Sequence, residues 1–175
     1  MRLAKLLAGI ALALAIHLVG TRLFPGFSRW VDVFLVAVVL HALSGNTLSA
    51  LLVGLGVGLL EDSLANGPLG LFGFADTLVA YGTARLAQRL VIQRATGVLL
   101  VVSFASLLQQ SILVLLAFML LPNPSLAAPL GMALHAALQA GACGLVGMTA
   151  YGAARNWSRT AEARRRGRMG RLRLE

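Results

Sequence analysis

Long apolar runs separated by short polar segments form the dominant pattern of the chain. Six such runs occur, over residues 1–20, 31–43, 47–60, 68–84, 95–121 and 130–154. Several of them approach the roughly 20 residues that a helix needs to cross the apolar core of a bilayer. The pattern predicts an all-α polytopic integral membrane protein with about six transmembrane helices, of which the second and third are short.

The second and third runs leave two arrangements open. They can form a re-entrant hairpin, or flanking residues can extend each to a crossing of about 16 residues in a locally thin membrane. The number of crossings is then four or six, and it is even in both cases. The first run begins with Arg2 and Lys5, and no small-x-small cleavage site follows it. We therefore expect a retained first helix rather than a cleaved signal peptide.

The composition supports a membrane protein. Of the 175 residues, 58% are hydrophobic and only 12% are charged, about half the charged share of a typical soluble domain. The mean hydropathy is +0.84. The single cysteine, Cys143, excludes an internal disulfide. With no tandem repeat and no low-complexity linker, we predict one transmembrane domain over residues 1–154 and a basic cytoplasmic tail over residues 155–175.

The distribution of charge predicts the topology. Eight arginines fall within residues 155–175, against Glu162 and Glu175, so about +6 of the net charge of +9 lies in the tail. With six crossings and a cytoplasmic N-terminus, thirteen of the fifteen basic residues lie on the cytoplasmic side, and only Arg22 and Arg29 lie outside. Both termini are therefore expected in the cytoplasm, with the tail near anionic lipid. No aromatic or folded reading module accompanies the charge, so nucleic acid is not an expected partner.

Residues 54–81 contain the most informative polar pattern. Glu61 and Asp62 follow a glycine-rich run and precede the break Asn66-Gly67-Pro68. This order predicts a helix, an acidic turn and a second helix. Adjacent carboxylates at a membrane edge are costly unless they are solvated, paired or structural. We expect either a solvated helix end at the outer surface or a contact with a periplasmic partner, and a positive φ at Gly67.

Glycine spacing in the third run predicts close helix packing. Gly54 and Gly58 are four residues apart, a small-xxx-small relation that lets two helices approach closely. The wider GxGxG string is not read as a nucleotide loop, because no soluble strand–turn–helix surrounds it. Asp32 stands before the second apolar helix, where a carboxylate complements exposed backbone N–H groups.

Several other polar groups interrupt the apolar runs. The most notable are Asp76, Gln109, Gln110, His135 and Gln139. Such residues either form interhelical hydrogen bonds or line a cavity. Glu61 and Asp62 are consecutive, so on a helix they diverge by about 100° and make a poor acid–base pair. We predict no catalytic residue, no metal site and no cofactor.

The segment GLLEDSLANGPLGLFGFADTLVAY, residues 58–81, resembles the signature of the rod shape-determining protein MreD family. The shared features are Gly-Leu-Leu-x-Asp, a short polar turn, Pro-Leu-Gly, and an apolar helix that ends in Val-Ala-Tyr. Chain length, helix number, Asp32 and the basic C-terminus also fit. Asp76 departs from the family pattern, in which an apolar residue is usual at this position.

The resemblance implies a non-enzymatic scaffold subunit of the bacterial elongation machinery in the inner membrane. The implied direct partner is MreC, a single-pass protein, together with the glycosyltransferase RodA and a class B penicillin-binding transpeptidase; the MreB cytoskeleton is an indirect partner. The implied fold is similar to the substrate-binding subunits of energy-coupling-factor transporters. No cofactor is implied.

The motif also implies which residues determine the fold or bind partners. They are Gly58, Asp62, Asn66, Gly67, Pro68 and Gly70, with Asp32 near the second helix. An alternative function, suggested by the fold similarity and by the polar groups in the apolar runs, is that of a small-molecule-binding subunit of a membrane transporter.

Overall fold

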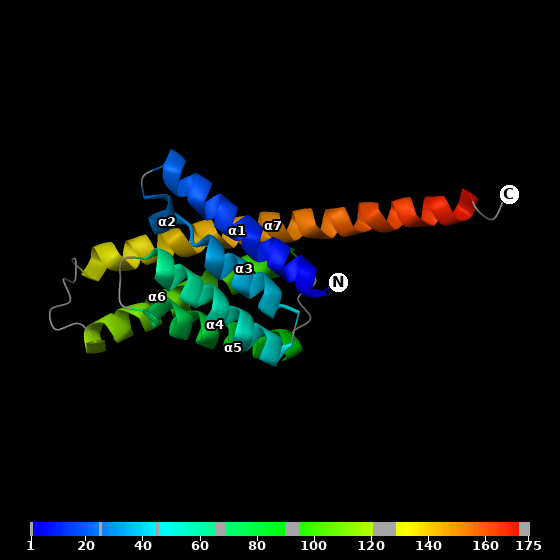
Figure 1. Cartoon of the computed structure of the whole chain (residues 1–175). Helices are drawn as coiled ribbons and strands as arrows, with labels where there is room; N and C mark the ends of the chain where they lie inside the picture. Colours follow the sequence, from blue (N-terminus) through cyan, green and yellow to red (C-terminus); the bar gives the residue numbers. More distant parts are fainter. Residues whose placement is uncertain are drawn as a thin grey trace.

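The computed structural model describes residues 2–24, 26–44, 46–65, 69–89, 95–120 and 129–171. This part of the chain is all-α, as predicted (Figure 1). Its helices are α1 (Arg2–Leu23), α2 (Phe27–Trp30), α3 (Val33–Ala42), α4 (Thr47–Leu64), α5 (Leu71–Arg89), α6 (Ala95–Leu120) and α7 (Pro129–Arg171).

Three segments of the described structure are long and apolar enough to cross a membrane. They are Thr47–Leu64, Ala95–Leu120 and Gly131–Trp157, and two shorter apolar helices cover Ala8–Leu23 and Val33–Ala42. These lengths indicate a multi-pass membrane protein. The prediction of a short third helix is wrong, because α4 continues past the acidic pair to Leu64 and reaches 18 residues.

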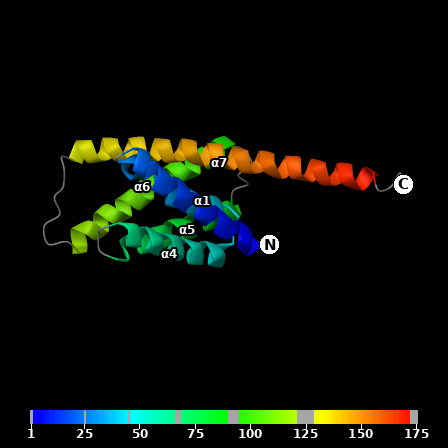
Figure 2. The ribbon, with the colours of Figure 1, turned by 45° about the horizontal axis from the view of Figure 1, so that its top comes forward.

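The helices form two antiparallel hairpins around a central helix. α4 packs along α5, α6 packs along α7, and α3 contacts α1 and both hairpins. Figure 2 shows α7 and α4–α5 on opposite sides, with α6 running obliquely between them. α3 is apolar all round and seven of its ten residues are buried, as expected for a helix surrounded by protein. The short helix α3 is therefore the central helix of the bundle.

The two ends of the helix bundle differ in charge. α1, α4 and α6 end at one end of the bundle, while the N-terminus of α1, the C-terminus of α5 and the C-terminal part of α7 point to the other (Figure 1). Arg85 and Arg89 lie at this second end, in the last turns of α5. The basic segments thus share one end, as the charge-based topology requires. That this end faces the cytoplasm stays a prediction.

α7 passes through the boundary that the sequence predicts between membrane domain and tail. The helix is continuous from Pro129 to Arg171, and its C-terminal part extends beyond the other helices (Figure 1). Alanine, arginine and glutamate dominate residues 160–166, and all three favour helix. The basic tail therefore prolongs the last helix through most of its length.

Glycines bring α4 and α5 into backbone contact. A Cβ atom on Gly54 would lie 2.7 Å from the carbonyl oxygen of Asp76, and one on Gly58 would lie 2.6 Å from the carbonyl oxygen of Phe72. Both distances are too short for a carbon atom. Gly56, between them, has nothing within 4 Å of the same position. The predicted small-xxx-small contact is confirmed for Gly54 and Gly58.

Replacement of Gly58 by alanine should destabilise the hairpin. The new methyl group would meet the α5 backbone, which cannot rotate away, and we expect a loss of about 1–3 kcal/mol in the free energy of unfolding. Gly56→Ala is the matched control, since its methyl group enters open space. Thermal unfolding of the purified proteins in detergent measures both. Equal melting temperatures for the two variants would contradict the contact.

Candidate functional site

The carboxylate of Asp62 binds the start of the neighbouring helix. Its side chain is 3% exposed. Oδ2 accepts the backbone N–H of Gly70 at 3.0 Å and that of Gly73 at 3.0 Å, and Oδ1 accepts the N–H of Phe72 at 3.1 Å. The first N–H groups of a helix have no partner within that helix. They lie at the positive end of the helix dipole, which favours an anion. Asp62 of α4 therefore caps α5.

This arrangement corrects the expectation of a solvated acidic turn. Asp62 is buried within α4, and the N–H groups of Gly70, just before α5, and of Phe72 and Gly73, in its first turn, take the place of water around the carboxylate. The adjacent Glu61 points in another direction, as the 100° step along a helix requires, and is only partly buried.

Gly70 is the motif residue with a special backbone conformation. Its φ is +102°, in the left-handed region that residues with a Cβ rarely adopt. This conformation turns its N–H toward Asp62 and lets its carbonyl oxygen accept the N–H of Phe74 at 2.9 Å. Asn66, Gly67 and Pro68 lie outside the described residues, so the positive φ expected at Gly67 stays a prediction.

Asp32 caps α3, as predicted, and also joins a network that the sequence did not predict. Its Oδ1 accepts the N–H of Leu35 at 2.8 Å. Its Oδ2 accepts a hydrogen bond from the amide Nε2 of Gln109 at 3.0 Å, and the same Nε2 also donates to Oδ1 of Asp76 at 2.8 Å. None of the three polar side chains is more than 6% exposed. One amide thus connects α3, α5 and α6.

The network explains why an aspartate stands at position 76, where the resemblance leads us to expect an apolar residue. Asp76 is 0% exposed and faces Gln109 rather than lipid. The backbone N–H of Asp32 also contacts Sγ of Cys143 at 3.3 Å, which brings α7 to the same place. No sequence signal separates these polar residues from others in the apolar runs, because their pairing depends on how the helices are rotated.

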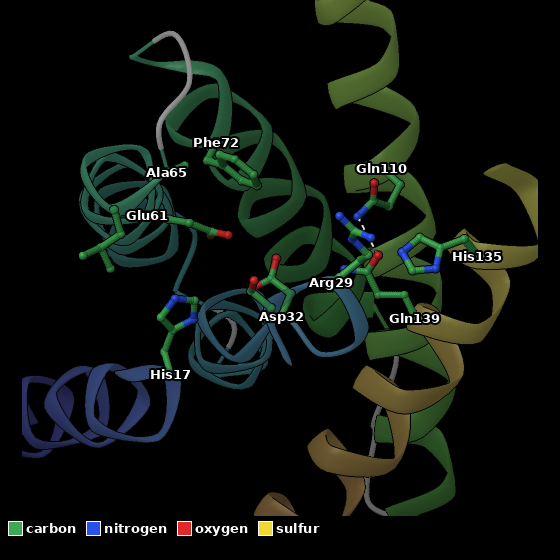
Figure 3. A pocket seen from close by; sticks show the side chains of 11 residues that line it. His17, Arg29, Asp32, Glu61, Ala65, Phe72, Gln110, His135 and Gln139 are labelled. Carbon is green, nitrogen blue, oxygen red and sulfur yellow. Dashed lines mark hydrogen bonds between the residues drawn. The ribbon is translucent and has the colours of Figure 1, made fainter. Parts of the chain in front are cut away.

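A pocket of about 400 Å³ opens next to this network (Figure 3). It is lined by His17, Ser28, Arg29, Asp32, Glu61, Leu64, Ala65, Phe72, Gln110, His135 and Gln139. Nε2 of Gln110 donates to Oε1 of Gln139 at 2.9 Å. His135 and Gln139 share a face of α7, as their spacing predicts. The predicted polar groups therefore do both things expected of them: they bond between helices, and some line a cavity.

Two arrangements typical of enzyme active sites are a metal site and a nucleophile with an oriented base. The described residues contain no group of three side chains able to hold a metal ion. His41 and Ser49 lie 2.8 Å apart through Nε2 and Oγ, but no described carboxylate bonds to His41 to orient it as a base. This pair joins α3 to α4. The absence of an enzymatic activity stays a prediction.

No known protein family, characterised protein or solved structure matches the chain. The resemblance to the MreD family and the similarity to energy-coupling-factor subunits therefore stay predictions.

Replacement of Asp62 by alanine should destabilise the protein strongly. It removes three hydrogen bonds to a charged acceptor and leaves the N–H groups of Gly70, Phe72 and Gly73 without a partner. We expect a loss of about 2–4 kcal/mol in the free energy of unfolding, and a smaller loss for Asp62→Asn, which keeps one oxygen. Thermal unfolding in detergent provides the measurement.

The control for this prediction is Ser63→Ala. Ser63 is the next residue along α4, is exposed, and its hydroxyl donates only to the carbonyl oxygen of Leu59 in its own helix. A melting temperature of the Asp62→Ala protein equal to that of this control would contradict the capping role.

Proposed function

We propose that the chain is a non-enzymatic scaffold subunit of the bacterial elongation machinery, similar to the MreD family. In this role it binds a single-pass MreC-like protein in the inner membrane and supports the RodA glycosyltransferase and the class B penicillin-binding transpeptidase. The MreB cytoskeleton is linked to it indirectly.

The observation that supports this proposal most strongly is that the described motif residues Gly58, Asp62 and Gly70 build the α4–α5 hairpin. Gly58 lets α4 and α5 touch, Asp62 caps α5, and Gly70 supplies the turn that the cap needs. All three build one rigid hairpin, and none of them lines the pocket. A motif of this kind suits a protein that works by presenting a fixed surface to other membrane helices.

A groove between α1 and α4 supports the proposal by offering such a surface. It has a volume of about 570 Å³ and is lined mainly by apolar residues, including Ile10, Leu52 and Gly56. Gly56 has open space in front of it, so a partner backbone can approach closely there. We assign this groove to the transmembrane helix of the MreC-like partner.

The proposal also fixes the topology. Crossings by α1, α3, α4, α5, α6 and α7 give six, with α3 extended by its flanking residues in a thinned membrane. The basic end of the bundle, with Arg85, Arg89 and the extension of α7, then faces the cytoplasm and anionic lipid.

A second candidate function is that of a small-molecule-binding subunit of a membrane transporter. The pocket beside Asp32 favours it, because about 400 Å³ falls within the range of small-ligand sites.

Affinity purification from native membranes after mild crosslinking, followed by mass spectrometry, separates the two functions. The scaffold role predicts recovery of a single-pass periplasmic coiled-coil protein together with RodA and the transpeptidase. Recovery of a pair of ATPases without these partners would support the transporter subunit and contradict the scaffold.

Gly56→Leu tests the groove within the same experiment. The leucine side chain would fill the space in front of α4, and we expect recovery of the single-pass partner to fall at least fivefold, while the protein accumulates normally. Gly82→Leu is the matched control, since Gly82 is also a helical glycine with nothing within 4 Å but lies on α5, away from the groove. Equal partner recovery with both variants would refute the assignment of the groove.

A further inference from the structure

We infer that the pocket between α1, α4 and α7 binds a small zwitterion, a molecule with an ammonium group at one end and a phosphate or carboxylate at the other. This inference goes beyond the scaffold role and does not depend on it. It rests on the arrangement of acidic and basic side chains on two sides of one cavity (Figure 3).

The acidic side of the pocket contains Glu61 and Asp32, with His17 beside them (Figure 3). Both oxygens of Asp32 already accept hydrogen bonds, from Leu35 and Gln109. Oε2 of Glu61 is buried and has no hydrogen-bond donor among the described residues. A buried carboxylate oxygen without a donor is costly, so Glu61 is the group that a ligand's ammonium would satisfy.

The opposite side of the pocket contains Arg29, His135, Gln110 and Gln139 (Figure 3). Arg29 has an exposed side chain at the pocket and forms no ion pair with a described residue. The bond between Gln110 and Gln139 uses one donor of Gln110, and the amide group of Gln139 keeps its own N–H donors. These donors and the guanidinium suit a phosphate or carboxylate.

The apolar wall and the volume restrict the size of the ligand. Leu64, Ala65 and Phe72 line the pocket beside Glu61, and they would contact the carbon chain between the two charged groups. A cavity of about 400 Å³ is large enough for a molecule such as phosphoethanolamine. The same chemistry occurs in a free solute and in the headgroup of phosphatidylethanolamine, so the experiment has to separate these two sources.

The test uses the full-length protein in nanodiscs of phosphatidylglycerol, which contain no zwitterionic lipid. Calorimetric titration with phosphoethanolamine should give saturable binding with one site per chain. Ethanolamine and inorganic phosphate, each of which has only one of the two charges, should bind at least tenfold more weakly. Absence of saturable phosphoethanolamine binding, together with absence of lipid retention in the arm below, would overturn the inference.

Two variants connect the binding to the pocket. Glu61→Gln keeps the shape of the side chain and removes its acidic group, and Arg29→Gln removes the guanidinium of an exposed side chain. Each should weaken binding roughly tenfold, the effect expected for one charged hydrogen-bond partner. Arg22→Gln removes an equal charge outside the pocket and should leave binding unchanged. If Arg29→Gln binds phosphoethanolamine as the unaltered protein does, the pocket is not the site.

A second arm identifies the source of the ligand. Native mass spectrometry of protein extracted from nanodiscs with equal amounts of phosphatidylethanolamine and phosphatidylglycerol shows which lipid is retained. Retention of phosphatidylethanolamine that Glu61→Gln abolishes assigns the pocket to a lipid headgroup. Binding of phosphoethanolamine without such retention assigns it to a free zwitterion. Retention of phosphatidylglycerol in preference would contradict the role of Glu61.

Discussion

The amide group of Gln109, held between the carboxylates of Asp32 and Asp76, is the interaction on which the interior of the protein depends. It connects α3, α5 and α6 in a region where all three polar side chains are buried. Little water reaches such a place, so the helices have to bring these polar groups close together. Oδ2 of Asp76 and Oε1 of Gln109 still have no hydrogen-bond partner among the described residues. Leu35, Val79, Val98 and Val102 of the same three helices are buried apolar residues. Their packing is less directional than the hydrogen bonds between the amide and the two carboxylates.

A second polar contact controls the α4–α5 hairpin in the same way. Asp62 fixes where α5 begins, and Gly54 and Gly58 fix how closely it approaches. Of the four acidic residues with described side chains, Asp32, Asp62 and Asp76 thus bind their own chain. Asp32 and Glu61 both line the pocket, and of these two only Glu61 has a buried oxygen without a hydrogen-bond partner. This division is the reason why we separate a structural motif from a ligand site, although Glu61 and Asp62 are neighbours in sequence.

The sequence predicted those features that depend on local rules. Apolar run lengths predicted the helical class, Asp32 was recognised as a helix cap, and the spacing of Gly54 and Gly58 predicted a close contact. The sequence-based prediction failed where a contact between distant residues offsets the free-energy cost of burying a polar side chain. For Asp62 the sequence left open a solvated helix end or a contact with a periplasmic partner, but N–H groups of the same chain, more than seven residues away, bind its carboxylate. The partnership of Gln109 with two carboxylates, 77 and 33 residues distant, depends on helix rotation, which hydrophobic periodicity does not determine in helices that are apolar on most sides.

A double-mutant cycle on Asp76 and Gln109 tests most directly whether buried polar contacts determine how the helices assemble. The free energy of unfolding is measured for the unaltered protein, Asp76→Ala, Gln109→Ala and the double variant, by denaturant titration in mixed micelles. The structure predicts that the sum of the two single losses in the free energy of unfolding exceeds the loss in the double variant by about 1 kcal/mol, which is the coupling energy of the two side chains. Losses that add to within about 0.3 kcal/mol would show that the two side chains act independently, and would contradict the account.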